Sequence, residues 1–171
     1  MMDFKAHIRD IPDFPKPGIL FRDITPLLAD ATAFRAVVDT IAERYRGGVD
    51  MVLGIESRGF IIGAPVAYAI GSGLALVRKP GKLPAHTFSA QYALEYGTDT
   101  LEIHCDAFGH PCRVLIVDDL LATGGTASAA ARLVEQLGGE VVACAFVIEL
   151  AALKGRERLG GYPITSLIEY A

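Results

Sequence analysis

VLIVDDLLATGGT, residues 114–126, is the stretch of sequence that decides the fold. It opens with four apolar residues, 114–117, a run typical of a strand that is buried on both faces of a sheet. Two carboxylates, Asp118 and Asp119, come next, followed by a short loop with two threonines and two glycines. A helix is predicted over residues 124–137, where Gly138-Gly139 ends it. The stretch therefore predicts a buried strand that ends in two acids, Asp118 and Asp119, called here the acidic edge. A loop with two glycines follows, and a helix starts after it.

The rest of the chain repeats this alternation of short apolar runs and longer helical segments. Parallel strands need crossover helices, so the alternation predicts an α/β fold with a central, mainly parallel sheet flanked by helices. Ligands of such sheets bind at the carboxyl ends of the strands, which makes the loops after Ile55, Val77 and Val117 the candidate binding loops. The other predicted strands are residues 51–55, 74–77 and 141–148, and the other predicted helices are residues 32–45 and 58–70.

Two segments depart from this alternation. Residues 11–26 are rich in proline and glycine, which predicts an ordered but irregular arm. Residues 87–104 contain polar and aromatic residues around Gly97, and apolar and polar residues alternate after it. This pattern predicts a hairpin-like excursion beside the mouth of the sheet that could close as a flexible lid. The length of 171 residues predicts one domain, residues 1–171.

Composition argues against several classes of function. The net charge is −4 with both signs mixed along the chain, unlike the basic excess of a general nucleic-acid binder. The three cysteines form no CxxC pair and are expected to be reduced thiols, and the scattered histidines argue against a zinc site. Residues 60–77 carry no charge, but proline and glycines interrupt them, so a helix and a strand are expected rather than a membrane span. Without a signal-peptide pattern at the N-terminus, we expect a cytoplasmic protein with no membrane partner.

The acidic edge and its loop suit a sugar phosphate. Glycines let the backbone approach an anion closely, and the N–H groups at the start of a helix point toward it. Thr123 and Thr126 add hydroxyl donors beside these N–H groups. Asp118 and Asp119 lie one step earlier, where they could accept hydrogen bonds from neighbouring sugar hydroxyls if the anion is a 5′-phosphate. The pattern therefore predicts a site for a phosphorylated sugar.

Two other interpretations of this stretch stay open. It could be a purely structural strand, turn and helix with Thr123 as the helix N-cap and solvated acids. It could also hold Mg²⁺ on Asp118 and Asp119, as the Walker-type site of a nucleoside triphosphatase does. Such a site needs a GxxxxGK[ST] phosphate loop as its partner, and none occurs in the chain.

Four stretches together resemble the type I phosphoribosyltransferases, and the resemblance covers nearly the whole chain. They are FPKPGILFRDITP (14–26), GIESRGF (54–60), RKPGKLP (78–84) with LEYG (94–97), and VDDLLATGGT (117–126). The last stretch marks the superfamily, and the others point to its adenine branch. The resemblance implies a reaction of purine salvage, in which the 5-phosphoribosyl group of phosphoribosyl diphosphate (PRPP) is transferred to adenine to give AMP and pyrophosphate.

The resemblance also implies a role for each matching position. Glu95 and Arg58 would be the catalytic residues, with Glu95 handling the imidazole proton of the purine. A cis non-proline peptide is expected before Ser57, the hood over the base would occupy about residues 1–30, and the catalytic loop about 84–104. The implied binding residues are Ala122, Thr123, Gly124, Gly125 and Thr126 for the 5-phosphate; Asp118 and Asp119 for the ribose hydroxyls; Glu56, Ser57 and Arg58 for pyrophosphate; Leu20, Phe21 and Arg22 for the hood; and Tyr96 on the catalytic loop.

Cations follow the predicted strand over residues 74–77. Arg78, Lys79 and Lys82 cluster there, and beside Arg58 they could neutralise a diphosphate. The resemblance implies that Mg²⁺ arrives bound to the diphosphate of PRPP, with no metal site made by the protein alone, and that the chain forms a homodimer. Pro80 departs from the pattern, since many relatives have a basic residue there, and this removes one charge from the loop.

Two rival functions remain. A non-catalytic sensor could bind PRPP and regulate a partner, but such regulators usually carry an added DNA-binding domain, for which 171 residues leave little room. A transferase of the same kind could act on hypoxanthine, xanthine or a pyrimidine, whereas the arm GILFR, residues 18–22, favours adenine.

Overall fold

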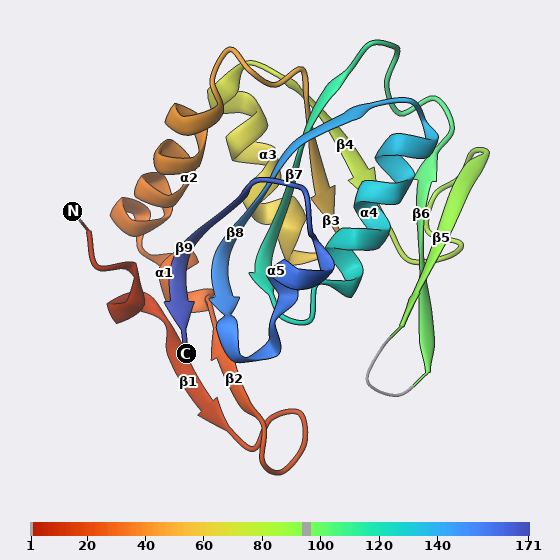
Figure 1. Ribbon diagram of the computed structural model, residues 1–171. Coiled ribbons are helices and arrows are strands. Elements are labelled where there is room, and N and C mark those ends of the chain that lie inside the picture. The colour runs from red at the N-terminus through yellow and green to blue at the C-terminus, as the bar shows by residue number, and fades with distance from the viewer. Residues whose placement is uncertain (1, 94–96) are drawn as a thin grey trace.

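A five-stranded parallel sheet forms the centre of the protein, as predicted (Figure 1). The computed structural model describes residues 2–93 and 97–171. Its sheet has the strand order β4-β3-β7-β8-β9, and all four pairings are parallel. The strands are β3 (Met51–Ile55), β4 (Gly73–Val77), β7 (Arg113–Leu121), β8 (Glu140–Leu150) and β9 (Ile164–Tyr170).

Helices cover both faces of this sheet, so the fold has three layers (Figure 1). Alternate residues of each strand point to opposite faces. Leu53 and Ile116 pack in the core with α4, whereas Val52 and Leu115 pack in the core with α2 and α3. The helices are α1 (Thr25–Ala29), α2 (Ala31–Tyr45), α3 (Arg58–Ile70), α4 (Gly125–Gln136) and α5 (Gly155–Arg158), with 3-10 turns η1 (Phe4–His7) and η2 (Ala151–Leu153).

The strand order contains one reversal, between β3 and β7. From β3 the chain crosses through α3 to β4 on one side, and from β7 it crosses through α4 to β8 on the other. Loops that leave adjacent strands in opposite directions open a crevice at the carboxyl ends of the strands, and ligands of open α/β sheets bind there. The loop after Ile55 and the loop after β7 therefore flank the expected binding crevice.

The uncharged residues 60–77 form a helix and a strand, as the sequence predicts. The helix α3 ends at Gly71, whose left-handed conformation (φ 81°) suits glycine. The edge strand β4 follows at once. Within residues 2–93 and 97–171, no helix is both long enough and apolar enough to cross a membrane.

The prediction of an irregular N-terminal arm was wrong in part. Strands β1 (Arg9–Pro12) and β2 (Leu20–Asp23) pair antiparallel. The prolines do not prevent the pairing, because Pro12 is the last residue of β1 and Pro15 and Pro17 lie in the connecting loop. At the other end, the buried Asp23 accepts hydrogen bonds from Arg9 Nε and Nη2 at 3.0 and 2.6 Å.

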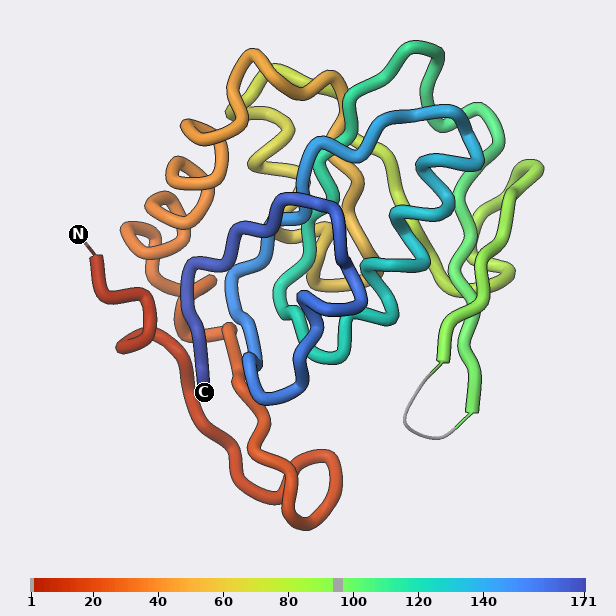
Figure 2. Tube along the Cα trace, in the orientation of Figure 1, coloured from red at the N-terminus to blue at the C-terminus, as the bar shows by residue number. Residues whose placement is uncertain are grey.

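The predicted hairpin beside the sheet is confirmed. Strands β5 (Thr87–Ala93) and β6 (Thr98–His104) pair antiparallel, and Leu101 and Ile103 of β6 are fully buried in the α4 side of the core. Figure 2 shows the β1–β2 and β5–β6 hairpins extending on either side of the carboxyl end of the sheet. Glu95 and Tyr96, both predicted site residues, lie outside the described residues.

Candidate active site

One ion pair spans the crevice between β3 and β7. Arg58, the first residue of α3, donates from Nε to Oδ2 of Asp119 on β7 at 2.5 Å. The Asp119 side chain is only 10% exposed, whereas that of Arg58 is 49% exposed. The arginine therefore satisfies a buried carboxylate and still presents a cationic surface to the crevice.

Asp118 lies next to this pair in a less favourable environment. Burial raises the pKa of Asp118 well above its usual value, and the neighbouring charge of Asp119 raises it further. The backbone N–H of Asp119 donates to Asp118 Oδ1 at 2.9 Å, which opposes this shift. Asp118 is thus a carboxyl group whose charged form is destabilised in the folded chain, and a perturbed pKa of this kind beside a crevice is typical of functional sites.

Gly59 brings the first turn of α3 against the end of β7. A Cβ atom at this position would lie 2.8 Å from the carbonyl oxygen of Val117 and 3.0 Å from Asp118 Oδ1. Only glycine permits this approach, and it places the start of α3 directly over the acidic edge.

The loop after the acidic edge encloses a small pocket of about 70 Å³. The left-handed Gly124 (φ 78°) is the N-cap of α4, and no side chain caps the helix. The interpretation of Thr123 as a structural N-cap is therefore wrong, and the backbone N–H groups of the first turn lack a side-chain acceptor from the cap. The pocket is lined by Asp118, Leu120, Leu121, Ala122, Thr123, Gly124, Gly125, Thr126, Ala127 and Phe146.

The loop after β3 is organised by Glu56. The peptide between Glu56 and Ser57 is cis, as the resemblance implied. The Glu56 carboxylate accepts hydrogen bonds from the backbone N–H of Lys79 at 2.9 Å and from Arg78 at 3.2 Å. The backbone hydrogen bond is the main cause that lowers the pKa of Glu56, with Arg78 contributing. The charge of Glu56 thus fastens the loop after β3 to the loop after β4.

Two cations of the predicted cluster after β4, Arg78 and Lys79, pair with acids of the protein itself. The guanidinium of Arg78 is held by Glu56 and donates to the Lys82 carbonyl oxygen at 3.2 Å. Lys79 Nζ forms an ion pair with Asp99 and donates to the Tyr92 hydroxyl at 2.8 Å. Arg78 and Lys79 therefore each have an internal carboxylate partner, because two acids that are distant in the sequence fold against them.

The predicted hood residues point in different directions. The Phe21 ring lies with its centroid 6.0 Å from the Arg58 guanidinium, next to the crevice, and Leu20 is exposed. Arg22 instead pairs with Asp10 and stacks 3.8 Å over the ring of Tyr170. Successive residues of a strand point to opposite faces, so β2 directs Phe21 and Arg22 to opposite sides.

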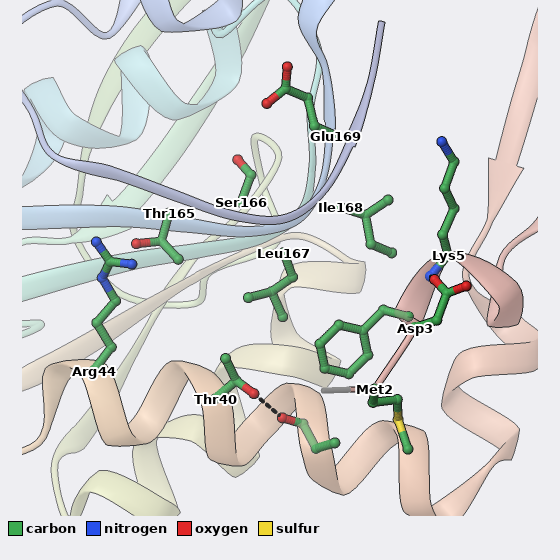
Figure 3. A pocket seen from close by; sticks show the side chains of 12 residues that line it. Met2, Asp3, Lys5, Thr40, Arg44, Thr165, Ser166, Leu167, Ile168 and Glu169 are labelled. Carbon is green, nitrogen blue, oxygen red and sulfur yellow. Dashed lines mark hydrogen bonds between the residues drawn. The ribbon is translucent and has the colours of Figure 1, made fainter.

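A larger cavity than the pocket beside the glycine loop lies elsewhere (Figure 3). It measures about 600 Å³ and lies between η1, α2 and β9. The hydroxyls on its wall have internal partners: Thr40 donates to the Ala36 carbonyl, Thr165 bonds to Tyr45, and Ser166 donates to Glu149, each at 2.6 Å. Among the residues that the structure describes, no predicted site residue lines this cavity. Volume alone does not locate the site in this fold.

Metal-ligating side chains do not gather in the part of the chain that the structure describes. Over residues 2–93 and 97–171, no group of three or more His, Cys, Asp or Glu side chains could hold an ion. The three cysteines are free, and burial raises the pKa of Cys144 to about 12, so this thiol stays protonated and unreactive at neutral pH.

Comparison with known proteins identifies the family to which this site belongs. The family profile of the phosphoribosyl transferase domain matches residues 27–167. The chain belongs to the phosphoribosyltransferase family. An adenine phosphoribosyltransferase of Solibacter usitatus is 60% identical over 171 residues, which cover 99% of each chain.

Solved structures of this phosphoribosyltransferase family have the same fold. The adenine phosphoribosyltransferase of Thermoanaerobacter pseudethanolicus superposes with a TM-score of 0.95 at 56% identity and 98% coverage of both chains. The Saccharomyces cerevisiae enzyme, solved with adenine and an imino-altritol bisphosphate, superposes with a TM-score of 0.91 at 41% identity and 96% coverage of both chains. These relatives match nearly the full length of the chain, and all three are adenine phosphoribosyltransferases.

Sequence reasoning missed several residues that hold the side chains around the candidate site. Asp99 and Tyr92, which hold Lys79, come from the hairpin, and nothing in their spacing relates them to Lys79. Glu149 is also buried at the carboxyl end of a strand, where Arg156 pairs with it at 2.6 Å. An acid at the end of an apolar run was the signal that identified Asp118, and it would have identified Glu149 too.

We expect Asp118→Asn to stabilise the folded chain at neutral pH. The raised pKa means that the folded state binds more protons than the unfolded state, so Asp118 reduces stability as pH rises above its unfolded value. Asparagine keeps the acceptor for the Asp119 N–H and removes the charge. The gain should be about 1 kcal/mol at pH 7 and vanish near pH 4, as measured by urea unfolding across that range. Asp39→Asn, on the exposed side of α2, is the control. A variant that is less stable at every pH would contradict this account.

Proposed function

We propose that the chain catalyses the transfer of the 5-phosphoribosyl group from PRPP to adenine, giving AMP and pyrophosphate, as a step of purine salvage. One observation carries the proposal: β7 delivers Asp118 and Asp119 to the crevice directly before a glycine loop that starts a helix. This arrangement lies in a chain similar over 99% of its length to adenine phosphoribosyltransferases. The adenine complex of the yeast relative supports the choice of base.

In this proposal the donor lies along the carboxyl edge of the sheet. Backbone N–H groups of residues 122–126 bind the 5-phosphate, with the hydroxyls of Thr123 and Thr126. Asp118 and Asp119 accept hydrogen bonds from the ribose 2- and 3-hydroxyls. The loop of Glu56, Ser57 and Arg58 holds the diphosphate on the opposite side of β7. Two separately anchored loops thus grip the two anionic ends of one substrate.

Bond exchange occurs at the anomeric carbon of the ribose. Its bond to the diphosphate oxygen breaks, the bond to N9 of adenine forms, and the imidazole proton of the purine leaves to a base. Glu95 on the catalytic loop takes this proton. Positive charge develops on the sugar ring as the bond breaks, so positioning and electrostatic stabilisation supply most of the rate. The carboxylates beneath the ring and the Arg58 guanidinium beside the diphosphate have suitable charges.

Mg²⁺ belongs to the donor in this scheme. It would be bound to the diphosphate, mainly through substrate oxygens and water, and would offset part of the charge of the leaving group. Such an ion does not require a cage of protein ligands, and the carboxylates of Asp118 and Asp119 are oxygen donors of the kind Mg²⁺ prefers. The base is held on the other side of the sugar, where the Phe21 ring offers a stacking surface and Leu20 an apolar one. Arg22 contributes its backbone, since its side chain pairs with Asp10.

The test is an assay of the pure protein with PRPP, Mg²⁺ and each nucleobase separately, following nucleotide and pyrophosphate. We expect AMP and pyrophosphate in equal amounts with adenine, and no nucleotide with hypoxanthine, xanthine or uracil. Product from another base would refute the assignment of the hood residues. Bound PRPP without product from any base would favour the sensor function.

Glu95→Gln should lower kcat by about 100-fold or more, because glutamine cannot accept the purine proton. The Kd of PRPP should change by less than about twofold, since the donor contacts are elsewhere. Steady-state rates and equilibrium binding measure the two effects. Asp106→Asn, an exposed acid after β6, is the control. Unchanged turnover would remove Glu95 from the mechanism.

We propose further that the chain forms a homodimer through α3 and β4. Ile61, Tyr68, Leu74 and Leu76 are large apolar side chains exposed on these two elements, and Tyr68 is 90% exposed. An apolar surface of this kind on an edge strand and its neighbouring helix is typical of a contact with another chain. Because α3 begins with Arg58, the proposed interface lies behind the diphosphate loop.

Tyr68→Glu should shift the protein from dimer to monomer, because it introduces a charge into a desolvated interface. Light scattering after size exclusion measures the mass, and the melting temperature shows whether the fold is intact. Arg35→Glu, exposed on α2, should leave the mass unchanged. A monomeric parent chain, or a dimeric Tyr68→Glu variant, would contradict the proposed interface.

A further inference from the structure

The short helix α5 packs against the outside of the phosphate loop. A Cβ atom on Gly155 would lie 2.3 Å from the Ala122 carbonyl oxygen and 2.8 Å from Cδ1 of Leu121. In the opposite direction, a Cβ atom on Gly124 would lie 2.5 Å from the Gly155 carbonyl oxygen. The two backbones therefore touch without any side chain between them. Figure 1 shows α5 beside the start of α4, at the carboxyl end of the sheet.

An ion pair between the half-exposed Arg156 and the buried Glu149, called here the clamp, holds α5 to the sheet. Arg156 donates from Nε and Nη2 to the two carboxylate oxygens of Glu149, each at 2.6 Å. Ser166 of β9 donates to the same carboxylate at 2.6 Å. The Glu149 side chain is only 4% exposed and lies near the end of β8. A bidentate pair of this kind fixes both the distance and the orientation of the arginine, and with it the helix.

Burial and hydrogen bonding shift the pKa of Glu149 in opposite directions. Burial raises the pKa of Glu149, but the hydrogen bonds from Arg156 and Ser166 outweigh it, and the pKa lies below its ordinary value. The carboxylate therefore stays charged at neutral pH, so the ion pair between Arg156 and Glu149 is formed at that pH. The diphosphate loop, on the other side of β7, is held separately by Glu56, which pairs with Arg78 and accepts a hydrogen bond from the backbone N–H of Lys79.

We propose that Gly155 and Arg156 are positioning residues for the 5-phosphate, because α5 forms the outer wall that sets the conformation of the phosphate loop. The inference rests on the proposed function, which places the 5-phosphate in that loop. The loop offers mainly backbone donors, and Gly124 in it is left-handed and without a side chain. Donors of this kind point at an anion only if the surrounding structure holds the backbone in place. The wall behind the loop therefore decides how well the phosphate binds.

The test compares two ligands that the two loops should bind separately. Ribose 5-phosphate needs the phosphate loop, whereas pyrophosphate with Mg²⁺ needs the loop of Glu56, Ser57 and Arg58. In Gly155→Ala and in Arg156→Ala, the Kd of ribose 5-phosphate should rise about tenfold or more, since small displacements of positioned donors have effects of this size. The Kd of pyrophosphate should change by less than about twofold. Isothermal titration calorimetry measures both.

Matched controls separate positioning from general destabilisation. Gly109→Ala adds a methyl group where nothing lies within 4 Å, and Glu157→Gln removes a charge from α5 itself without touching the clamp. Both should bind the two ligands like the parent chain. Arg156→Lys keeps the charge but loses the bidentate geometry, so its Kd for ribose 5-phosphate should lie between those of the parent chain and Arg156→Ala. If Arg156→Ala does not fold, Gly155→Ala and Arg156→Lys still provide the measurement.

The outcomes distinguish this inference from the proposed function. A selective loss of ribose 5-phosphate binding in the α5 variants supports the inference. Equal binding of ribose 5-phosphate by parent and variants, or equal losses for both ligands, overturns the inference and leaves the proposed function standing. A parent chain that binds pyrophosphate but not ribose 5-phosphate refutes the assignment of the phosphate loop and overturns both.

Discussion

Two adjacent carboxylates at the end of a buried strand lose hydration and repel each other, so they need compensating groups close by. Here the compensation comes from across the crevice, where Arg58 donates to Asp119 at 2.5 Å. This contact requires that the loop after β3 and the end of β7 lie next to each other, which the reversal of strand order between them provides. Asp118 receives only one backbone N–H and keeps a raised pKa. The fold thus pairs Asp119 with a cation and leaves the charged form of Asp118 destabilised.

Close backbone contacts complete this edge. Gly59 lets the first turn of α3 rest on the carbonyl oxygen of Val117, and Gly124 and Gly155 let α5 rest on the loop before α4. At each contact a methyl group would lie within 2.8 Å of a backbone oxygen. The glycines therefore bring helix starts and loops nearer to the strand ends than other residues allow. Backbone N–H groups gain access to the crevice by the same means.

The sequence predicted the parts of the fold that have strong periodicity. The strand over 51–55 and the helix over 58–70 have the predicted bounds, because both are nearly pure apolar segments. Strand β9 was not predicted, since ITSLIEY mixes buried and half-exposed positions on an edge strand. At the candidate site, the position of Asp118 and Asp119 at the end of a buried strand could be predicted from the apolar run before them, and the resemblance added Arg58, which the structure places beside Asp119. The partners of Arg78, Lys79 and Arg22 could not, since Glu56, Asp99 and Asp10 are distant in the chain and only the fold brings them close.

The two anion loops on the proposed assignment are supported from opposite sides of β7. The Glu56 carboxylate accepts a hydrogen bond from the backbone N–H of Lys79, and the Lys79 side chain pairs with Asp99, so the diphosphate side is tied to the β5–β6 hairpin. The phosphate side is tied through Arg156 and Glu149 to β8 and β9. In the proposed reaction the anomeric carbon lies between the bound 5-phosphate and the bound diphosphate. The distance between these two groups must be fixed, because orientation of the reacting groups supplies much of the rate. Ion pairs to separate parts of the sheet and to the β5–β6 hairpin fix that separation.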